Sequence, residues 1–457
     1  MLHLAKRYDV IVIGSGSGAI VAERALWQDL SVALVDRGPL GGTCLNVGCV
    51  PSKLLIYPAD RIVAAQEATK LGIRIEIAGI DFPAIMQRMR TIVKEGSDYV
   101  RKALGKTNIV LYEAEASFVD DYTLEVAGER IRGDKIFIAA GARPVIPPIP
   151  GLGDVDYLTN ESVLALTKPP ASLLILGGGY IAVEYAHFFA AMGTQVTILE
   201  RQHHLVADEE PELSLILKRK LSERMTVHTD TEGFAVRREG DGVVVLGRNL
   251  VTGRVSEFAA ERLLIAVGRQ SNADRLHLQA TGVEIDTRGF ITVNGYLETS
   301  KANIWAFGDV IGKQMFIHVA NQEAMLAWHN SVHKDKVEMD YSAVPRAIFT
   351  HPQLAAVGLT EAEAKKSHNV LVGKAEYQQV AAGEAMMETD GLAKAVVDKD
   401  SGKILGFHVI GPYASIVIQE VIDVMANRGN IHSITTAMHI HPALSELVVA
   451  TLQSLTA

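Results

Sequence analysis

The sequence predicts an α/β protein with two similar parallel-sheet domains, followed by a C-terminal domain of strands and helices. An apolar run, a glycine-rich turn, a helical stretch and a second apolar run occur in that order twice, over residues 8–36 and 172–200. Beyond residue 343, short strand-like and helix-like stretches alternate without a third glycine-rich turn. The 457 residues are enough for two or three domains.

The first glycine-rich turn, in "YDVIVIGSGSGAIVAERAL", has the spacing of a dinucleotide-binding unit. The apolar run before it lacks polar alternation, which is typical of a parallel strand buried on both faces. The first glycine makes a tight turn, the second lets the backbone approach a pyrophosphate, and a third small residue lets the helix pack on the strand. The helix N-terminus favours phosphates, and an acid about 20 residues onward binds a ribose. Gly14 and Gly16 are the first two glycines, Ala19 takes the third position, Asp36 is the acid, and Gly18 is a further candidate.

The second turn, in "SLLILGGGYIAVEYAHFFAAMGTQVTILE", repeats this arrangement with Gly177, Gly179, Ala182 and Glu200. One glycine trio could be a plain loop, but two complete units with strand, helix and terminal acid predict two Rossmann-like dinucleotide sites. The terminal Glu200 favours NAD, because a carboxylate pairs with a free ribose hydroxyl and repels a 2′-phosphate. NADP stays open as the alternative, since the next residues include Arg201, His203 and His204.

Both cysteines of the chain, Cys44 and Cys49, lie in one segment, "LGGTCLNVGCVPSK". Three uses of such a pair are open: a structural disulfide, a zinc site and a reversible dithiol. A structural disulfide is disfavoured in the cytoplasm, and a zinc site needs four ligands where this chain has no second cysteine pair. A redox-active pair beside the first nucleotide site favours a flavin there and the nicotinamide nucleotide at the second site. We expect no bound metal.

The residues after Cys49 favour a reactive thiolate. The stretch "VPSKLLIYPADRIVAA" predicts a helix, with Pro51 in the first turn, where proline is tolerated. The helix N-terminus and Lys53 place positive charge near Cys49. A different class of protein also stays open, namely a flavoprotein that transfers electrons or serves as a structural subunit with idle cysteines.

Composition and charge limit the partners. The formal net charge of -9 argues against nucleic acid or an anionic membrane as the main partner. The longest apolar stretch contains a glycine cluster, Glu184 and His187, so it is a poor membrane span. The first residues lack the pattern of a secretory signal. We therefore expect a cytoplasmic protein.

Three later segments indicate how the domains are joined. The runs "IFIAAGARP" (136–144) and "LLIAVGRQSN" (263–272) are predicted strands that cross between the nucleotide domains. The run "IWAFGDV" (304–310) is a predicted strand ending in Gly308 and Asp309, an acid suited to the ribityl or phosphate region of a flavin. The predicted domains are an FAD-binding domain over 1–145 and 271–342, an NAD(P)-binding domain over 146–270, and a third domain over 343–457.

Together these segments resemble the class I flavoprotein disulfide reductases. "GGTCLNVGCVPSK" is similar to the redox-active segment of that family, and "GSGSGA", "AAGARP", "GGGYIAVE", "AVGRQSN", "FGDV", "HVANQEA" and "THPQLAAVGLTEAEA" occur in family order. The resemblance covers nearly the whole chain. It implies two Rossmann-like dinucleotide-binding domains, a C-terminal α+β dimerisation domain, FAD and NAD as cofactors, and a homodimer.

The resemblance also implies roles for individual residues. Cys44 would be the interchange thiol that reacts with the substrate, and Cys49 the charge-transfer thiol that faces the flavin. Lys53, paired with Glu184, would lie near the reactive nitrogen of the flavin. Tyr180 matches a residue that covers the nicotinamide pocket in some members, although helix packing explains it equally well. The further implied cofactor contacts are Gly42, Thr43, Ala116, Ala140, Gly141, Gly268, His318 and Ala320.

The segment "MHIHPALSELV" supplies a candidate acid–base pair, His441 and Glu446. A histidine before proline is more often structural, and two histidines at i and i+2 lack a third ligand for a metal. Thiol–disulfide exchange, however, needs a base for the thiol proton, and a carboxylate fixes the tautomer of an imidazole. The family carries this pair as "HPxxxE" and uses its histidine at the cysteines of the other subunit. We expect His441 to be the base and His439 to be structural.

Within the family, the sequence resembles dihydrolipoamide dehydrogenase most, through "GCVPSK", "VTILE" and "HPALSE". "RQSNAD" and "HVANQEA" are also similar to mycothione reductase. The tail "LVVATLQSLTA" lacks the extra cysteine pair of mercuric reductases, and Ser52 and Glu200 differ from glutathione reductases. We expect electrons to pass from dihydrolipoamide, carried by a partner protein of a multienzyme complex, to NAD. The alternative is a small-thiol disulfide reductase that uses NAD(P)H and runs the same path backwards.

Overall fold

The computed structural model describes residues 5–456 of the chain, which divides into two compact units. The first unit extends to Ser52 and includes Gln87–Val145 and Gly268–Asp340. The second unit consists of Lys53–Met86, Ile146–Val267 and the chain from Tyr341 onward. Helices α3 (Cys49–Glu67) and α4 (Phe82–Leu104) each run from one unit into the other.

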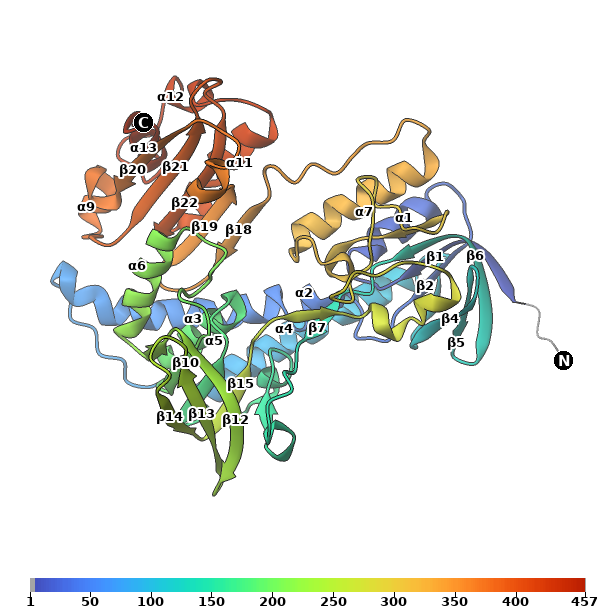
Figure 1. Ribbon diagram of the computed structural model, residues 1–457, viewed down its shortest axis with the longest axis horizontal. Helices are drawn as coiled ribbons and strands as arrows, with labels where there is room; N and C mark the ends of the chain where they lie inside the picture. The colour runs from blue at the N-terminus through green and yellow to red at the C-terminus, as the bar shows by residue number, and fades with distance from the viewer. Residues whose placement is uncertain (1–4, 457) are drawn as a thin grey trace. The chain divides into compact units, whose positions relative to one another are not determined.

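The first unit is built on one sheet (Figure 1). Its strands are β1 (Lys6–Ile13), β2 (Val32–Val35), β3 (Val110–Tyr112), β4 (Ala116–Asp120), β5 (Thr123–Val126), β6 (Glu129–Ile138) and β17 (Ile304–Ala306). The strand order is β3-β2-β1-β6-β5-β4, and β17 also pairs with β6. β1, β2, β3, β6 and β17 are parallel, and β4 and β5 add an antiparallel edge. The central strands are apolar and buried, because helices and loops cover both faces.

Besides most of α4 and the start of α3, the first unit contains α1 (Gly18–Leu26), α2 (Gly42–Asn46), α7 (Ile317–Val332), and the antiparallel pair of β7 (Ala142–Pro144) with β16 (Arg269–Ser271). α1 packs against β1, β2 and α7. The expected crossing segments at 136–144 and 263–272 are thus confirmed as strands, and their ends pair with each other.

The second unit contains a five-stranded parallel sheet of order β11-β10-β9-β15-β8. The strands are β8 (Tyr157–Leu158), β9 (Ser172–Leu176), β10 (Gln195–Leu199), β11 (Thr226–His228) and β15 (Arg262–Ile265). Helix α5 (Tyr180–Ala191) packs on β9 and β10, and α6 (Pro211–Ser222) packs on β11. An antiparallel sheet of β12 (Thr231–Glu239), β13 (Gly242–Asn249) and β14 (Val255–Ala260) lies beside it.

The C-terminal part of the second unit is an α+β domain around an antiparallel sheet of order β18-β19-β22-β21-β20. Its strands are β18 (Pro345–Ile348), β19 (Gln353–Gly358), β20 (Val370–Glu376), β21 (Leu392–Asp398) and β22 (Ile404–Gly411). Its helices are α8 (Glu361–Ala364), α9 (Ala381–Ala385), α10 (Ala414–Val417), α11 (Gln419–Ala426), α12 (His432–Thr435) and α13 (Glu446–Gln453). Apolar side chains from the sheet and the last helices share one core.

The predicted fold class is therefore confirmed, including both strand–turn–helix–strand units. One packing detail differs from the expectation. A Cβ on Gly18 would lie 2.8 Å from Cγ1 of Val12, so Gly18 makes the close helix–strand contact expected for Ala19, which is half-buried. The limits drawn for the three domains stay a prediction.

Candidate active site

The cysteine segment begins helix α3. Cys44 lies in the short helix α2 and is half-buried, while Cys49 is the first residue of α3 and is exposed. The predicted helix after Cys49 is thus confirmed, with Pro51 in its first turn. The positive dipole end of this 19-residue helix favours a thiolate at Cys49. The Ser52 hydroxyl donates to the Cys49 carbonyl at 3.2 Å.

A buried asparagine holds the loop that carries these cysteines. The side-chain amide of Asn46 donates to the carbonyls of Leu40 and Gly42 at 3.0 and 2.9 Å, and approaches that of Pro39 at 3.3 Å. The backbone of Gly41 donates to the Ser15 hydroxyl at 2.9 Å. The cysteine loop is thereby attached to the first glycine-rich turn. Asn46 belongs to no pattern that sequence reasoning uses, so its role became visible only in the structure.

The first glycine-rich turn carries no side chain where its backbone meets the cysteine loop. A Cβ on Gly42 would lie 2.7 Å from the Cα of Gly16, so these two backbones pass each other in contact. Asp36 lies directly after β2, and its carboxylate accepts from the backbone of Ser15 at 2.6 Å and of Gly38 at 2.7 Å. The residues present fit a dinucleotide: a side-chain-free cradle for phosphates and a fixed carboxylate for a ribose.

A second acid of the first unit, Asp309, lies three residues beyond β17, in the short 3-10 helix Gly308–Ile311, so the strand ends earlier than the predicted run 304–310. Its carboxylate is largely buried, and burial raises its pKa. Nε of Arg269 lies 3.5 Å from it and is a buried donor with no hydrogen-bond partner in residues 5–456. Such an orphaned donor beside a carboxylate fits a polar ligand, and FAD is the expected one. Arg269 was not among the residues proposed from the sequence.

The residues around Asp309 are tightly packed. The backbone of Gly308 donates to the buried carboxylate of Glu323 at 2.7 Å, and a Cβ on Gly308 would lie 3.3 Å from that of Ala320. His318, in the first turn of α7, stacks on Phe316 with ring centroids 5.5 Å apart. The other expected contacts of the first unit are placed as follows: Thr43 in α2, Ala116 at the start of β4, Ala140 and Gly141 between β6 and β7, and Gly268 before β16.

In the second unit, Lys53 and Glu184 form the pair implied by the resemblance. Nζ of Lys53 lies 2.9 and 2.8 Å from the two carboxylate oxygens of Glu184, on helices α3 and α5. Glu184 also accepts from the backbone of Phe349 at 3.0 Å, and Nζ of Lys53 lies 4.4 Å from the centre of the Phe349 ring. Glu184 is buried, so the ion pair and the aromatic face fix the position of the ammonium group. Phe349 is a further residue that sequence reasoning missed.

The second glycine-rich turn resembles the first, and the unit that it opens ends at Glu200, directly after β10. Gly179 is the N-cap of α5, Tyr180 begins that helix and is exposed, and Ala182 is buried. One carboxylate oxygen of Glu200 accepts from the backbone of Gln202 at 2.5 Å. A Cβ on Gly179 would meet nothing within 4 Å, so the N-terminus of α5 is open to the phosphates of a second dinucleotide.

The basic residues after Glu200 are differently engaged. Nδ1 of His203 lies 3.0 Å from the carboxylate of Asp230, and the rings of His203 and His204 are 4.6 Å apart. An imidazole committed to a carboxylate is a weaker ligand for a 2′-phosphate. His203 is therefore held by Asp230, and the choice between NAD and NADP stays a prediction.

His441 and Glu446 also meet. Nδ1 of His441 lies 2.9 Å from one oxygen of Glu446, and the backbone of Ala443 donates to the other at 3.0 Å. These two hydrogen bonds, that of Ala443 first, lower the pKa of Glu446. Because an ionised Glu446 only accepts, Nδ1 carries the proton and the lone pair of Nε2 is available to a substrate. The His441 side chain is 72% exposed, so the imidazole points into solvent in the single chain.

His439 differs from His441 in its surroundings. Its Nε2 lies 2.9 Å from Glu420, its Nδ1 lies 3.2 Å from the carbonyl of Ala437, and its side chain is 13% exposed. Both nitrogens are engaged within the chain, which agrees with the structural role expected for His439.

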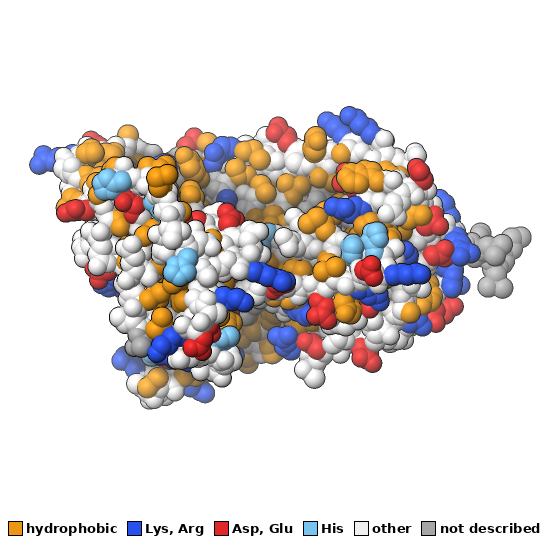
Figure 2. Space-filling model, turned by 90° about the horizontal axis from the view of Figure 1, so that it is seen from above, with side chains coloured by type: hydrophobic (Ala, Val, Ile, Leu, Met, Phe, Trp, Pro, Cys, Tyr) orange, Lys and Arg blue, Asp and Glu red, His pale blue; other side chains and the backbone are white. Residues whose placement is uncertain are grey.

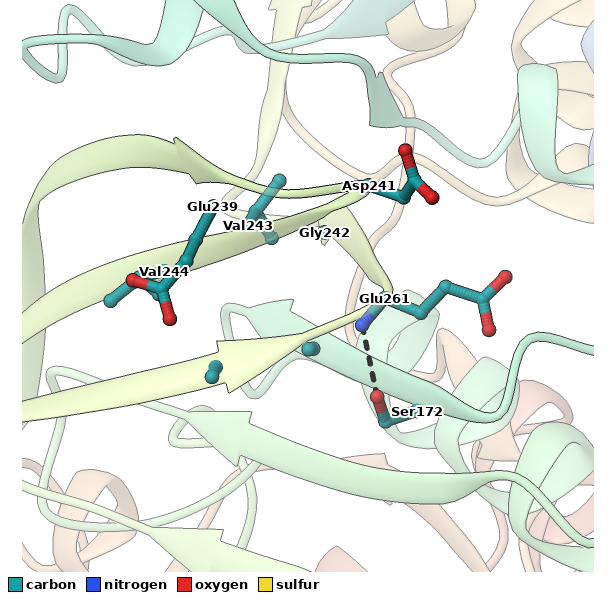
Figure 3. Close-up of a pocket in the computed structure, with 9 residues that line it drawn as sticks. Ser172, Glu239, Asp241, Gly242, Val243, Val244 and Glu261 are labelled. Carbon is teal, nitrogen blue, oxygen red and sulfur yellow. Dashed lines mark hydrogen bonds between the residues drawn. The ribbon is translucent and has the colours of Figure 1, made fainter.

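A shallow hollow at the β12–β13 hairpin is lined by Glu239, Asp241 and Glu261, whose carboxylates point in different directions (Figure 3). Among residues 5–456 no group of three or more His, Cys, Asp or Glu side chains is placed to hold a metal ion. No helix in this range is long and apolar enough to cross a bilayer. On the face in Figure 2, basic and acidic side chains are interspersed and form no extended basic surface.

Two dinucleotide cradles, a cysteine pair at a helix N-terminus and a lysine paired with a buried glutamate define a nucleotide-dependent thiol–disulfide oxidoreductase. Comparison with known proteins agrees with this class. The family model "Pyridine nucleotide-disulphide oxidoreductase" matches residues 8–324, and the model of the dimerisation domain of that family matches residues 344–452. The chain belongs to this family, whose members use FAD and NAD(P)H. The dimerisation domain indicates a homodimer.

Relatives in this family carry several names. The chain is 35% identical to mycothione reductase of Mycobacterium tuberculosis, over 96% of this chain and 98% of that protein. It is 37% identical to mercuric reductase of Streptomyces lividans (92% and 90%) and 32% identical to dihydrolipoyl dehydrogenase of Chlamydia muridarum (96% and 95%). A similar solved structure is the HOCl-induced flavoprotein disulfide reductase RclA from Escherichia coli, with 28% identity, a TM-score of 0.87 and coverage of 98% and 99%.

Proposed function

We propose that this protein transfers electrons between a small dithiol and NAD, with dihydrolipoamide as the thiol substrate. The arrangement that carries the proposal is Cys49 at the N-terminus of α3, one turn before Lys53, which is locked against Glu184. The carboxylate at Glu200 and the engaged His203 support NAD. We place the reaction in the cytoplasm, where a cysteine pair can alternate between dithiol and disulfide.

Each residue has a defined task in this proposal. The substrate thiolate attacks Sγ of Cys44 in the Cys44–Cys49 disulfide, which forms a mixed disulfide and releases Cys49 as a thiolate. The second substrate thiol then displaces Cys44, so the substrate leaves as a disulfide and the chain holds two reduced cysteines. His441 takes the proton from the attacking thiol at Nε2, and Glu446 stabilises the imidazolium. Bound FAD would supply the transfer of the electron pair from the reduced cysteines to NAD.

The cofactor contacts follow from the two turns. Gly14, Gly16, Asp36 and Asp309 would hold FAD, while Gly177, Gly179 and Glu200 would hold NAD. Lys53 would supply a fixed positive charge to the flavin, and Tyr180 would border the nicotinamide site.

An anaerobic titration of the flavin-loaded protein with dihydrolipoamide tests the substrate. We expect a long-wavelength absorption band from the Cys49 thiolate beside the flavin, followed by formation of NADH when NAD is added. Bleaching of the flavin without this band, with either dihydrolipoamide or NADH, would show that the cysteines are outside the electron path.

A variant at the base tests the proton transfer separately. His441→Gln should keep reduction of the cysteine pair by NADH but lose turnover with thiol substrates by about 10²–10⁴-fold. His439→Gln is the matched control and should retain most turnover, because that ring is engaged within the chain. Normal turnover in His441→Gln would remove this residue from the mechanism.

A small-thiol disulfide reductase is the second candidate. The mycothione reductase relative, aligned over 96% of this chain, favours it. In that case the band would form with NADH but not with dihydrolipoamide, and a low-molecular-weight disulfide would reoxidise the protein.

A further inference from the structure

The connection between α3 and α4 exposes apolar side chains in an unusual concentration. Every residue from 69 to 81 is exposed, and Ile73 and Ile75 are each 52% exposed. Isoleucine is among the residues most often buried in folded proteins, and contiguous exposed apolar surface marks interaction sites. The exposed apolar residues of this connection are Leu71, Ile73, Ile75, Ile77 and Ile80.

The sequence of this connection alternates with a period of two. Isoleucines at 73, 75 and 77 are separated by Arg74 and Glu76. In an extended chain this pattern places the isoleucines on one face and the charges on the other. Within the described chain, no backbone group of residues 74–80 hydrogen-bonds to another residue. The connection therefore has the composition and the open backbone of a strand that lacks a partner strand.

Both ends of the connection are anchored in the second unit. Glu67, near the end of α3, lies 3.2 Å from Nε2 of His351 in the dimerisation domain, and the hydrogen bond from His351 lowers the pKa of Glu67 to about 2. At the other end, the buried Phe82 ring packs against Phe188 and Phe189 at 5.9 and 6.5 Å. One end of the connection is thus attached to the domain through which the family dimerises, and the other end to helix α5.

The charges make this segment complementary to itself. If two copies pair antiparallel about Ile75, then Ile75 faces Ile75, Ile73 faces Ile77, and Arg74 faces Glu76 on both sides of the axis. Opposite charges across a strand pair are favourable, and like charges are unfavourable. Moving the centre by one residue would place Arg74 opposite Arg74 or Glu76 opposite Glu76, so the charges select the register centred on Ile75.

We propose that residues 73–77 of two copies of this chain pair as antiparallel strands across the twofold axis of the homodimer. The dimer interface then extends beyond the dimerisation domain to the connection between α3 and α4. A closed twofold interface uses the same patch on both subunits, which this self-complementary segment provides. The proposal does not depend on the identity of the thiol substrate.

Charge reversal tests this pairing. In a homodimer of Arg74→Glu, the introduced carboxylate faces Glu76, and in one of Glu76→Arg, two guanidinium groups face each other. A heterodimer of the two variants restores both opposite-charge pairs. Differently tagged copies of the two variants are coexpressed and their dimers are separated. Random pairing would make one half of all dimers heterodimers, and we expect heterodimers to make up about nine in ten.

The control uses another exposed arginine and glutamate with the same spacing, Arg237 and Glu239. When one tagged copy carries Arg237→Glu and the other carries Glu239→Arg, heterodimers should make up one half of all dimers. The proposal fails if the Arg74 and Glu76 variants also give one half. Flavin content of all variants checks that they fold, which is expected because the substituted side chains are exposed.

A cross-linking experiment tests the register. In a background with Cys44→Ser and Cys49→Ser, Ile75→Cys should be joined to its copy by a short bismaleimide, because Ile75 faces itself across the axis. Ile80→Cys also lies in the connection but outside the paired stretch, so it should stay monomeric on a denaturing gel. Equal cross-linking of both variants, or none at Ile75→Cys, would overturn the register.

Discussion

The two glycine-rich turns have nearly the same backbone. Gly14 and Gly177 adopt φ angles of +104° and +108°, and a Cβ on either residue would overlap the carbonyl oxygen of Ala139 or Ala266, each the first residue after a neighbouring strand. Only glycine tolerates both the left-handed angle and the close carbonyl. The first position of each turn is therefore determined by the backbone of the turn itself, whichever nucleotide is bound.

The turns differ at the next position, where the first has Ser15 and the second has Gly178. Ser15 donates its backbone N–H to the short acid Asp36 and accepts from the cysteine loop through its hydroxyl. A Cβ on Gly178 would lie 2.8 Å from both Cγ and Oε2 of Glu200. The first turn thus combines a serine with the shorter acid, aspartate, and the second combines a glycine with the longer acid, glutamate. The first turn gains a link to the redox segment, and the second gains an acid of longer reach.

The largest expected effect comes from filling the shared position. Gly14→Ala and Gly177→Ala should each strain their turn by about 1–3 kcal/mol, because a side chain must adopt a left-handed angle and displace a carbonyl. We expect Gly14→Ala to lose most bound flavin. Gly177→Ala should remain yellow and lose most reduction by NADH. Absorption spectra and NADH titrations distinguish the two losses.

Gly193→Ala is a matched control for these two substitutions. Gly193 also has a positive φ, of +90°, but nothing lies within 4 Å of a Cβ placed there. It should keep both flavin and NADH reduction while showing a lower melting temperature. If Gly177→Ala lost its flavin instead, the assignment of the two nucleotides to the two turns would be wrong.

The second prediction transfers the packing of the first turn to the second. Gly178→Ser should displace Glu200 and raise KM for NADH about tenfold, with little change in flavin content. The double variant with Glu200→Asp recreates the Ser–Asp pair of the first turn and should recover part of the loss, because the shorter acid leaves room for the added Cβ. Steady-state kinetics with NADH measure both.

The rescue is the decisive comparison in this experiment. Glu200→Asp alone should also weaken NADH binding, since the carboxylate is withdrawn by one methylene group. A double variant worse than the sum of the two single variants would contradict a steric link between residues 178 and 200.

These turns also show how far sequence reasoning reaches. Glycine spacing, buried apolar runs and terminal acids are local patterns, so they predicted both nucleotide units and the helix that begins at Cys49. Resemblance to a family supplied the pairing of Lys53 with Glu184, which are 131 positions apart in the chain. No local pattern connects residues so distant, and hydrophobic periodicity gives no information about them.

The supporting residues could not be predicted for the same reason. Asn46, Phe349 and Arg269 act through backbone carbonyls, a backbone N–H or one distant carboxylate. Their roles depend on where other segments lie in the folded chain. The steric match of Gly178 with Glu200 likewise requires the distance between the turn and the end of β10.

The smallest expected effect concerns the choice between NAD and NADP at the second turn. Asp230→Asn removes the charge that engages His203, so this imidazole becomes available to a 2′-phosphate. Exposed ion pairs are worth about 0–1 kcal/mol, and the gain in kcat/KM for NADPH should therefore stay below about fivefold, with NADH unaffected. Adding His203→Gln should abolish the gain, because the phosphate then loses its cation. If NADH improved as much as NADPH, Asp230 would act on the turn as a whole, and Glu200 would be the one determinant of nucleotide choice at this end of β10.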